Sequence, residues 1–479
     1  MAGGNQLKDL QNQLGSLTTK NYKQLLLLRR ERLAEFIRFK TENYHGMGHE
    51  LQVKTHKEAR GYPVVSIVSP VLTTHENKIE FPGDPMCLYN ALAYPIKQVV
   101  LTGNAITFGL NGFPSKMIGE YNDVCPDWFN LPAKEYRASV CADVGNHRIF
   151  LKEGLNTDQY VFDPRVWNPD VASRLKDILT TLEPRVVLIS SVSPAHRYAI
   201  EIAKLVKDVD ENAVVVLGGR HADETIRLAG GSAKYAPSSL ISAIQNGKAP
   251  PVVDFVVSGE GYYALDYLMK CTSLSMDVET KRTTPKKAID AVMQNTAALA
   301  ALPGNSLITY LEGGRYPVSL AINGKKTDIS ELPVPYEPFA IRAHFPIFKS
   351  KDGKMRSVTA HVNTAHACPF ACSFCSESTG VVGKIVSIKS QDHYKKIIRS
   401  YIEWGADALF FDDSVLCAGD SKKILMLVRA MKKIREDASE KLKRMGKSHP
   451  DYGAVLRMAN FEWGAQFTVD YLVSINSAE

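Results

Sequence analysis

The chain has 479 residues, of which 45% are hydrophobic and 23% charged, as expected for a globular protein of about two to four domains. Its formal net charge of +7 is spread over a long chain and gives little support for binding to nucleic acid or anionic lipid. The sequence lacks both an uncharged apolar run of about 18 residues and the apolar core of a signal peptide, so we expect a cytoplasmic protein without membrane contacts.

Residues 1–60 are predicted to form a helical N-terminal segment. The run NYKQLLLLRRERLAEFIRFKTENY contains no proline and is rich in Leu, Arg, Lys and Glu, which all favour helix. The basic side chains are compatible with a nucleic-acid face, but their helical spacing favours a solvated surface.

Residues 61–272 are predicted to form an α/β domain around a parallel sheet. Short β-branched runs alternate there with amphipathic helices, such as the one spanning VASRLKDILTTL and the one spanning HRYAIEIAKLVKDV. The predicted strands are VVSIVSP (64–70), QVVLTGN (98–104), RVVLISS (185–191), AVVVLGG (213–219) and DFVVSGEG (254–261). Residues 104–170, with Cys125, Trp128 and Trp167, do not follow the alternation and are interpreted as an insertion.

Small and polar residues follow three of these strands, where open parallel sheets bind their ligands. Glycines there let a bulky group approach the backbone, and small hydroxyls can hydrogen-bond it. The candidate binding residues are Ser190, Ser191, Ser193, Gly218, Gly219, His221, Gly259, Glu260 and Gly261. Each signal is weak by itself, since Gly-Gly after a strand is commonly only a turn, but their order and spacing together indicate a binding edge.

Residues 273–340 are predicted to be a linker, because they combine charged KRTTPKKAID with the proline-marked ELPVPYEPFA. Residues 341–479 then return to alternating strands and helices. The predicted strands lie in RSVTAHVNT (356–364), ADALFFDDSVL (406–416) and AQFTVDYL (465–472), separated by helices in SQDHYKKIIRSYIEWG and DSKKILMLVRAMKKI. The basic side chains of the run KKIREDASEKLKRMGK, on the outer face of the second helix, are expected to be solvated.

The stretch HVNTAHACPFACSFCS (361–376) carries three cysteines in a C-x3-C-x2-C array. Cys368, Cys372 and Cys375 can together hold one metal centre, because thiolate is the ligand that zinc and iron–sulfur clusters prefer. Three ligands would leave one iron of a four-iron cluster open to a substrate. Two alternatives remain: a Cys3His zinc site completed by His361 or His366, and three ordinary core cysteines.

The cysteine spacing, with Phe374 just before the last cysteine, resembles the cluster motif of radical S-adenosylmethionine (SAM) enzymes. The resemblance implies that Cys368, Cys372 and Cys375 bind a [4Fe-4S] cluster whose fourth iron chelates SAM. By the same analogy, the SAM-binding candidates are Phe374, Asp412, Asp413 and Gln466, with Thr468 nearby. Asp412 and Asp413 have an equally good alternative as a cap for the helix that follows.

Upstream, the order S-S-x-S, then GG-x-H-A, then DFVVSGEG resembles the Rossmann-like cobalamin-binding domain that precedes the barrel in one class of radical SAM enzymes. The resemblance covers about residues 62–272 and implies that the strand-end residues named above bind cobalamin. The sequence contains no Asp-x-His-x-x-Gly motif, which implies cobalamin held without a histidine ligand below the cobalt. His196 and His221 are candidates to touch the corrin or its tail, or else are surface or capping histidines.

The resemblance implies a cobalamin-dependent radical SAM enzyme that cleaves SAM to a 5′-deoxyadenosyl radical. The expected reaction is methylation, or rearrangement, of an unactivated carbon in a small metabolite, with flavodoxin or ferredoxin as electron donor. Only 104 residues follow Cys375, whereas six strand-and-helix units of about 30 residues each make a radical SAM barrel, so a partial barrel of about three strands is expected. A subunit that needs a partner chain to complete the barrel is the alternative, and RNA modification is disfavoured because the sequence shows no basic RNA-binding module.

Overall fold

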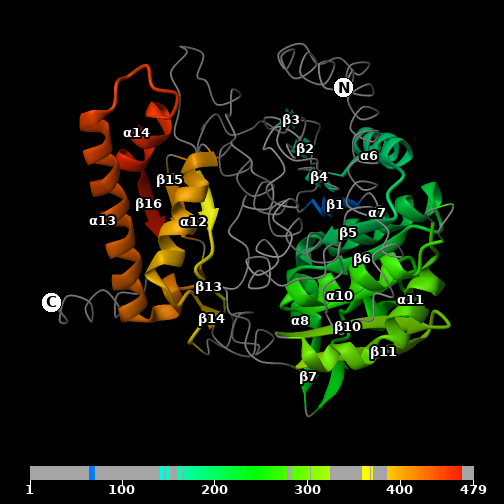
Figure 1. The fold of residues 1–479 in the computed structure, drawn as a ribbon. Coiled ribbons are helices and arrows are strands. Elements are labelled where there is room, and N and C mark those ends of the chain that lie inside the picture. The colour runs from blue at the N-terminus through cyan, green and yellow to red at the C-terminus, as the bar shows by residue number, and fades with distance from the viewer. Residues whose placement is uncertain are drawn as a thin grey trace. The chain divides into compact units, whose positions relative to one another are not determined.

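The computed structural model describes residues 64–70, 141–144, 147–150, 159–163, 167–229, 231–277, 280, 282–302, 304–323, 359–366, 368–370, 386–404, 406, 408–411 and 413–465. The predicted helical segment 1–60 and the predicted strand 98–104 lie outside these residues. The described residues divide into two compact units, the first ending at Asn323 and the second beginning at Thr359 (Figure 1). None of the described helices is both long enough and apolar enough to cross a membrane.

The first unit is built on a nine-stranded sheet with the order β11-β10-β9-β6-β5-β1-β4-β2-β3. Neighbouring strands from β9 to β2 are parallel, whereas β3, β10 and β11 are antiparallel to their neighbours. The strands are β1 (Val64–Val68), β2 (Cys141–Val144), β3 (His147–Phe150), β4 (Gln159–Asp163), β5 (Val186–Ser190), β6 (Val214–Gly218), β9 (Phe255–Gly259), β10 (Asn305–Glu312) and β11 (Tyr316–Asn323).

The central strands are mainly apolar because helices cover both faces of the sheet. Val187 and Ile189 of β5 belong to one core, together with α6 (Pro169–Leu182), α7 (His196–Val209) and α9 (Leu240–Gln245). Val186 and Leu188 belong to the other core, together with α10 (Gly261–Leu274) and α11 (Pro285–Gln294). Alternate residues of one strand thus face opposite cores, which accounts for the continuous hydrophobic runs in the sequence.

Short elements complete the first unit. The helix α8 (Arg220–Thr225) follows β6, and a two-stranded hairpin of β7 (Ile226–Ala229) and β8 (Ser232–Tyr235) follows α8. Two 3-10 turns, η2 (Ser193–Ala195) and η3 (Thr296–Ala301), precede α7 and β10.

Two stretches differ from the sequence-based expectations. Within the expected insertion at 104–170, β2, β3 and β4 extend the sheet beyond β1, and α6 begins at its end. The expected linker at 273–340 contains α11 and the hairpin β10–β11, which continues the sheet beyond β9. The hairpin signal was present in NSLITYLEGGRYPVSLAIN, where Gly313 and Gly314 adopt positive φ angles of 59° and 72° in the turn.

The second unit contains a three-stranded parallel sheet in the order β12-β15-β16, and the described residues form no closed barrel. Its elements are β12 (Thr359–Val362), β13 (Ala365–His366), β14 (Val386–Ser387), α12 (Gln391–Trp404), β15 (Ala408–Phe411), η7 (Leu416–Gly419), α13 (Ser421–Arg444), α14 (Tyr452–Asn460) and β16 (Glu462–Ala465). The third strand therefore starts before the predicted range 465–472, and residues beyond Ala465 lie outside the described part of the chain.

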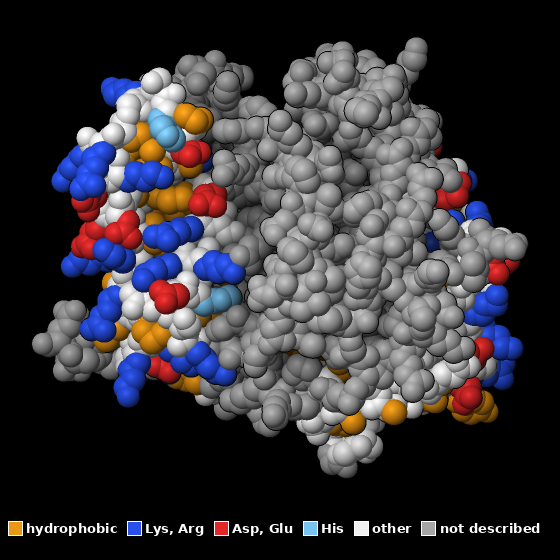
Figure 2. Space-filling model, in the orientation of Figure 1, with side chains coloured by type: hydrophobic (Ala, Val, Ile, Leu, Met, Phe, Trp, Pro, Cys, Tyr) orange, Lys and Arg blue, Asp and Glu red, His pale blue; other side chains and the backbone are white. Residues whose placement is uncertain are grey.

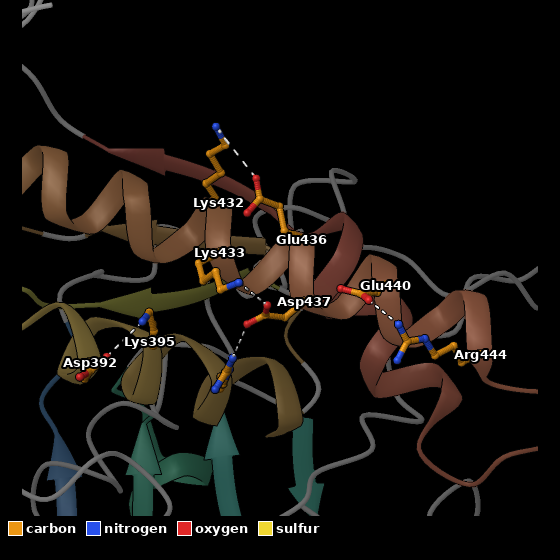
Figure 3. A network of polar contacts seen from close by, with 9 residues as sticks. Asp392, Lys395, Lys432, Lys433, Glu436, Asp437, Glu440 and Arg444 are labelled. Carbon is orange, nitrogen blue, oxygen red and sulfur yellow. Dashed lines mark hydrogen bonds and ion pairs between the residues drawn. The ribbon is translucent and has the colours of Figure 1, made fainter.

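The outer face of α13 is lined with charged pairs, as expected from its sequence. Figure 3 shows Lys433 reaching Asp437 and Arg444 reaching Glu440, with N–O distances of 2.9 and 2.6 Å. In Figure 2, basic and acidic side chains intermingle over this part of the surface. Exposed pairs of this kind contribute little to stability, because water and salt screen the charges, so this face of α13 is mainly a solvated surface.

Candidate functional site

The carboxyl edge of the first unit's sheet has a topological switch point between β1 and β5. From β1 the chain builds outward through β4 on one side, and from β5 it builds outward through β6 and β9 on the other. Ser69 directly follows β1 there, and it donates its N–H to Ser190 O at 2.9 Å and its hydroxyl to Ala195 O at 2.9 Å. In open α/β sheets the crevice at such a point is the usual ligand site.

Most of the strand-end residues selected from the sequence meet at this edge. Buried Ser191 donates its N–H to Gly218 O at 3.0 Å, and its carbonyl accepts the N–H of His221 at 3.0 Å. Ser193 Oγ lies 3.1 Å from His221 Nδ1 and donates to Glu224 Oε2 at 2.7 Å. The end of β5 and the start of α8 are therefore joined by hydrogen bonds between polar groups.

Two of the glycines are required by contacts within the protein itself. Gly219 has a φ of 90°, and a Cβ there would lie 2.8 Å from Ser190 Oγ and from the backbone of Ser191. Gly259 has a φ of 88°, and a Cβ there would lie 2.3 Å from Asn305 O. Gly261, by contrast, has no atom of the described residues within 4 Å of its Cβ position, so contacts within the described part of the chain do not require a glycine there.

Two histidines stack at the same edge. The rings of His196 and His221 have centroids 3.8 Å apart and planes inclined at 25°. Burial lowers the pKa of both rings, and the neighbouring His221 helps bring the pKa of His196 to about 4. Both ring nitrogens of His196 and Nε2 of His221 are buried without a hydrogen-bond partner among the described residues.

Asp223 connects this edge to β9, and Glu260 connects it to β10. Asp223 Oδ1 accepts the N–H of Gly259 at 2.8 Å, and buried Glu260 donates its N–H to Asn305 O at 3.0 Å. Asp223 was not selected from the sequence, and its position two residues before the end of the short helix α8 gave no signal for this contact.

In the second unit, Cys368 is the one candidate cluster ligand within the described residues. It is a free, partly exposed cysteine that follows the short strand β13, beyond the carboxyl end of β12. Cys372, Cys375, Phe374, Asp412, Gln466 and Thr468 lie outside the described residues. Within the described part of the chain, no group of three or more His, Cys, Asp or Glu side chains is arranged to hold a metal ion.

Asp413 is buried and binds backbone groups rather than facing solvent. Its Oδ1 accepts the N–H groups of Thr364 at 2.6 Å and Ala365 at 2.9 Å. Its Oδ2 accepts the hydroxyl of Thr364 and the N–H of Cys417 at 2.9 Å. Burial raises the pKa of Asp413, and these hydrogen bonds oppose that rise. Direct contact with SAM stays a prediction for Phe374, Asp412 and Gln466.

The helix-cap alternative does not apply to Asp413 either. Asp420 is the N-cap of α13, where its side chain accepts the N–H groups of Lys422 at 3.0 Å and Lys423 at 3.2 Å. Asp413 instead belongs to a buried polar cluster with Thr364, Cys417 and Tyr394, in which Cys417 Sγ lies 3.4 Å from the Tyr394 hydroxyl and 3.5 Å from Thr364 Oγ1.

No protein-family model matches the chain. Among solved structures, the radical S-adenosylmethionine methyltransferase TsrM from Kitasatospora setae, described with cobalamin and a [4Fe-4S] cluster bound, covers 85% of this chain and 59% of its own with a TM-score of 0.39 and 13% identity.

Three curated proteins are similar in sequence. The anaerobic magnesium-protoporphyrin IX monomethyl ester cyclase of Cereibacter sphaeroides is 26% identical over 229 residues, which is 47% of this chain and 30% of the relative. The cyclase of the same name from Rubrivivax gelatinosus is 25% identical over 228 residues, 48% of this chain and 33% of the relative. An uncharacterized methyltransferase of Pyrococcus horikoshii is 27% identical over 211 residues, 43% of this chain and 34% of the relative. The matches thus span about a third of the relatives' length.

This chain resembles the cobalamin-binding radical SAM enzymes. The residues at the sheet edge fit a large amide-bearing ligand such as cobalamin, because both ring nitrogens of His196 and Nε2 of His221 are buried without a partner among the described residues, and no described atom lies within 4 Å of the Cβ position of Gly261. At the cysteine motif, the soft donor Cys368 fits an iron–sulfur cluster and is not consumed by a disulfide.

Proposed function

We propose that this chain is the cobalamin- and cluster-binding part of a radical SAM enzyme that methylates an unactivated carbon of a small molecule. Cys368, Cys372 and Cys375 would bind a [4Fe-4S] cluster, and cobalamin would bind at the carboxyl ends of β1, β5, β6 and β9. The C-x3-C-x2-C motif at the end of a parallel strand carries this proposal, and the similarity to named cyclases and to a named methyltransferase supports it.

The cofactors would supply the reductive cleavage of SAM and the methyl group, and the protein supplies positions and a defined environment. Ser69, Ser190 and Ser191 present backbone and hydroxyl groups around the switch point. His196, which is neutral at pH 7 because burial brings its pKa to about 4, can accept a hydrogen bond from a ligand amide at one ring nitrogen and donate one at the other.

Metal analysis after anaerobic reconstitution tests the cluster assignment. We expect about four irons and four sulfides per chain, and fewer than about one after Cys368, Cys372 and Cys375 are all changed to Ala. Cys271→Ala is the matched control, because Cys271 is a fully buried cysteine in α10 of the first unit and should leave the iron content unchanged. Stoichiometric zinc in place of iron would contradict the proposal.

Binding of hydroxocobalamin, followed by its visible spectrum, tests the cobalamin assignment separately. We expect about one equivalent to remain bound after gel filtration, and less after Gly261→Leu fills the open space at the sheet edge. Unchanged binding by Gly261→Leu would place cobalamin elsewhere.

Ring formation without methyl transfer is the second candidate function, since two of the relatives are named cyclases. The two reactions differ in their products. Methylation consumes a second SAM as methyl donor and yields S-adenosylhomocysteine with 5′-deoxyadenosine, whereas cyclisation yields 5′-deoxyadenosine alone. If 5′-deoxyadenosine forms only after a second polypeptide is added, the chain is a subunit that needs a partner.

A further inference from the structure

The loop that carries the cysteines is held at its base by two short strands. Ala365–His366 (β13) pairs antiparallel with Val386–Ser387 (β14), and Thr364 O accepts the N–H of Ile388 at 3.0 Å. The segment between these strands contains all three cysteines of the motif. Whatever fixes Thr364 and Ala365 therefore fixes the end of the loop that leads into Cys368.

Asp413 is the side chain that makes this attachment. Its carboxylate is 2% exposed and accepts four hydrogen bonds, three of them from Thr364 and Ala365 and the fourth from the N–H of Cys417. The carboxylate therefore joins the base of the cysteine loop to the segment that follows β15. All four donors are uncharged, so the carboxylate acts as a multiple acceptor and not as half of an ion pair.

The segment that supplies the fourth donor has an unusual backbone. Cys417 and Ala418 have φ angles of 51° and 53°, the left-handed region that non-glycine residues rarely adopt. This conformation directs the N–H of Cys417 toward Asp413 Oδ2, while the Cys417 thiol lies 3.4 Å from the Tyr394 hydroxyl. Such a conformation persists only where its surroundings impose it, which indicates that the junction has one fixed geometry.

We propose that Asp413 is a positioning residue for the cysteine loop: by holding Thr364 and Ala365 against the segment after β15, it sets the place of Cys368 and thereby the geometry of the metal site. This inference rests on the proposed function, because it assigns a support to the same site. An amide in place of the carboxylate would present N–H groups to at least one of the four donors, and the attachment would be broken there.

The test compares Asp413→Asn with two milder variants of its partner. Thr364→Ser keeps the hydroxyl and the N–H that Asp413 accepts, and Thr364→Val removes only the hydroxyl. We expect metal affinity in the reconstituted protein to fall about tenfold or more in Asp413→Asn, to fall less in Thr364→Val, and to stay near wild type in Thr364→Ser. In parallel, the SAM-induced change in the electron paramagnetic resonance spectrum of the reduced protein should be lost in Asp413→Asn.

A readout without metal separates positioning from general destabilisation. In the apoprotein, brief treatment with iodoacetamide followed by peptide mass spectrometry should show faster alkylation of Cys368 in Asp413→Asn and Thr364→Val than in wild type or Thr364→Ser. The matched control is Asp254→Asn, a buried carboxylate of the first unit that accepts the N–H of Val215 at 2.7 Å. It should lower the melting temperature without changing Cys368 alkylation or metal affinity.

The results decide between the two roles. If Asp413→Asn and Thr364→Val lower the melting temperature but keep wild-type metal affinity, SAM response and Cys368 alkylation, then Asp413 only stabilises the fold and the inference is overturned. If the wild-type chain binds no iron–sulfur cluster, the proposed function fails, and the alkylation rates alone then decide whether Asp413 positions the loop.

Discussion

His196 and His221 stack face to face at the carboxyl edge of the parallel sheet, with ring centroids 3.8 Å apart. The two residues come from the starts of different helices, α7 and α8, and the pair lies beside Ser193 and Glu224. Because both rings are desolvated, protonation of either ring destabilises the folded state. The free energy of unfolding of the first unit therefore depends on pH.

We expect stability to fall as the pH is lowered from about 6.5 to about 4. The pKa of His196 is about 4 in the folded protein against 6.5 for an ordinary histidine, so in this window the unfolded chain binds a proton that the folded chain does not. The stabilisation is complete above pH 6.5 and is lost toward pH 4, by about 2–3 kcal/mol.

Urea unfolding between pH 7 and pH 4 measures this loss, and His196→Asn should make stability less dependent on pH. Exposed His449→Ala is the control, and an unchanged slope in His196→Asn would contradict the assignment.

The glycines at the sheet edge should differ sharply in their tolerance of alanine. Gly259→Ala is expected to destabilise by more than about 2 kcal/mol, because its Cβ would lie 2.3 Å from Asn305 O at a φ of 88°. Gly261 is the first residue of α10, and a Cβ there would lie more than 4 Å from every atom of the described residues. Gly261→Ala should therefore be neutral or stabilising by up to about 1 kcal/mol. Denaturation midpoints of the two variants check this, and equal losses would show that steric contact with β10 is not the cause.

Removal of the Lys207 charge should lower the free energy of unfolding. Lys207 Nζ lies 2.7 Å from Asp254 Oδ2, and the two side chains are only 15% and 11% exposed. Burial raises the pKa of Asp254 and Lys207 opposes that rise, so Lys207→Met leaves a buried carboxylate without its cation and should cost about 3 kcal/mol. Lys433→Met, which breaks an exposed pair with Asp437, should leave the urea midpoint almost unchanged in the same titration, because solvent screens that pair. Similar losses in both variants would contradict the importance of burial.

Native-state alkylation should distinguish Cys368 from Cys417. Cys417 is fully buried, and burial raises the pKa of its thiol to about 11, so it carries little thiolate at pH 8. Cys368 is partly exposed and should react first in the metal-free protein. Peptide mass spectrometry after treatment with iodoacetamide at pH 8 gives the order, and unfolding in urea should make the two cysteines equally reactive. Early modification of Cys417 would show that the cluster around Asp413 opens readily.

The parts of the fold that depend on local pattern could be predicted from the sequence. The strands β5, β6 and β9 appear as continuous apolar runs, and the helix expected over HRYAIEIAKLVKDV has the same bounds as α7. The binding edge followed from these strands, because residues after parallel strands come together whatever lies between them.

The remaining features depend on contacts between distant segments. The steric constraint on Gly259 could not be seen in the sequence, since the carbonyl that forbids a side chain there belongs to Asn305, in a hairpin that was expected to be a linker, and its contact with a ligand stays a prediction. Asp413 was likewise assigned to SAM or to a helix cap, because nothing in its neighbourhood in the sequence shows that its main donors lie 48 and 49 residues earlier.

The order of the strands along the chain has a consequence for biosynthesis. The hairpin β10–β11 forms one edge of the nine-stranded sheet, and all nine strands precede β12 in the chain. When the ribosome reaches β12, every strand of the first sheet has therefore already been translated. The first unit can complete its hydrogen-bonded ladder during translation, before the thiols of the C-x3-C-x2-C motif emerge to meet metal.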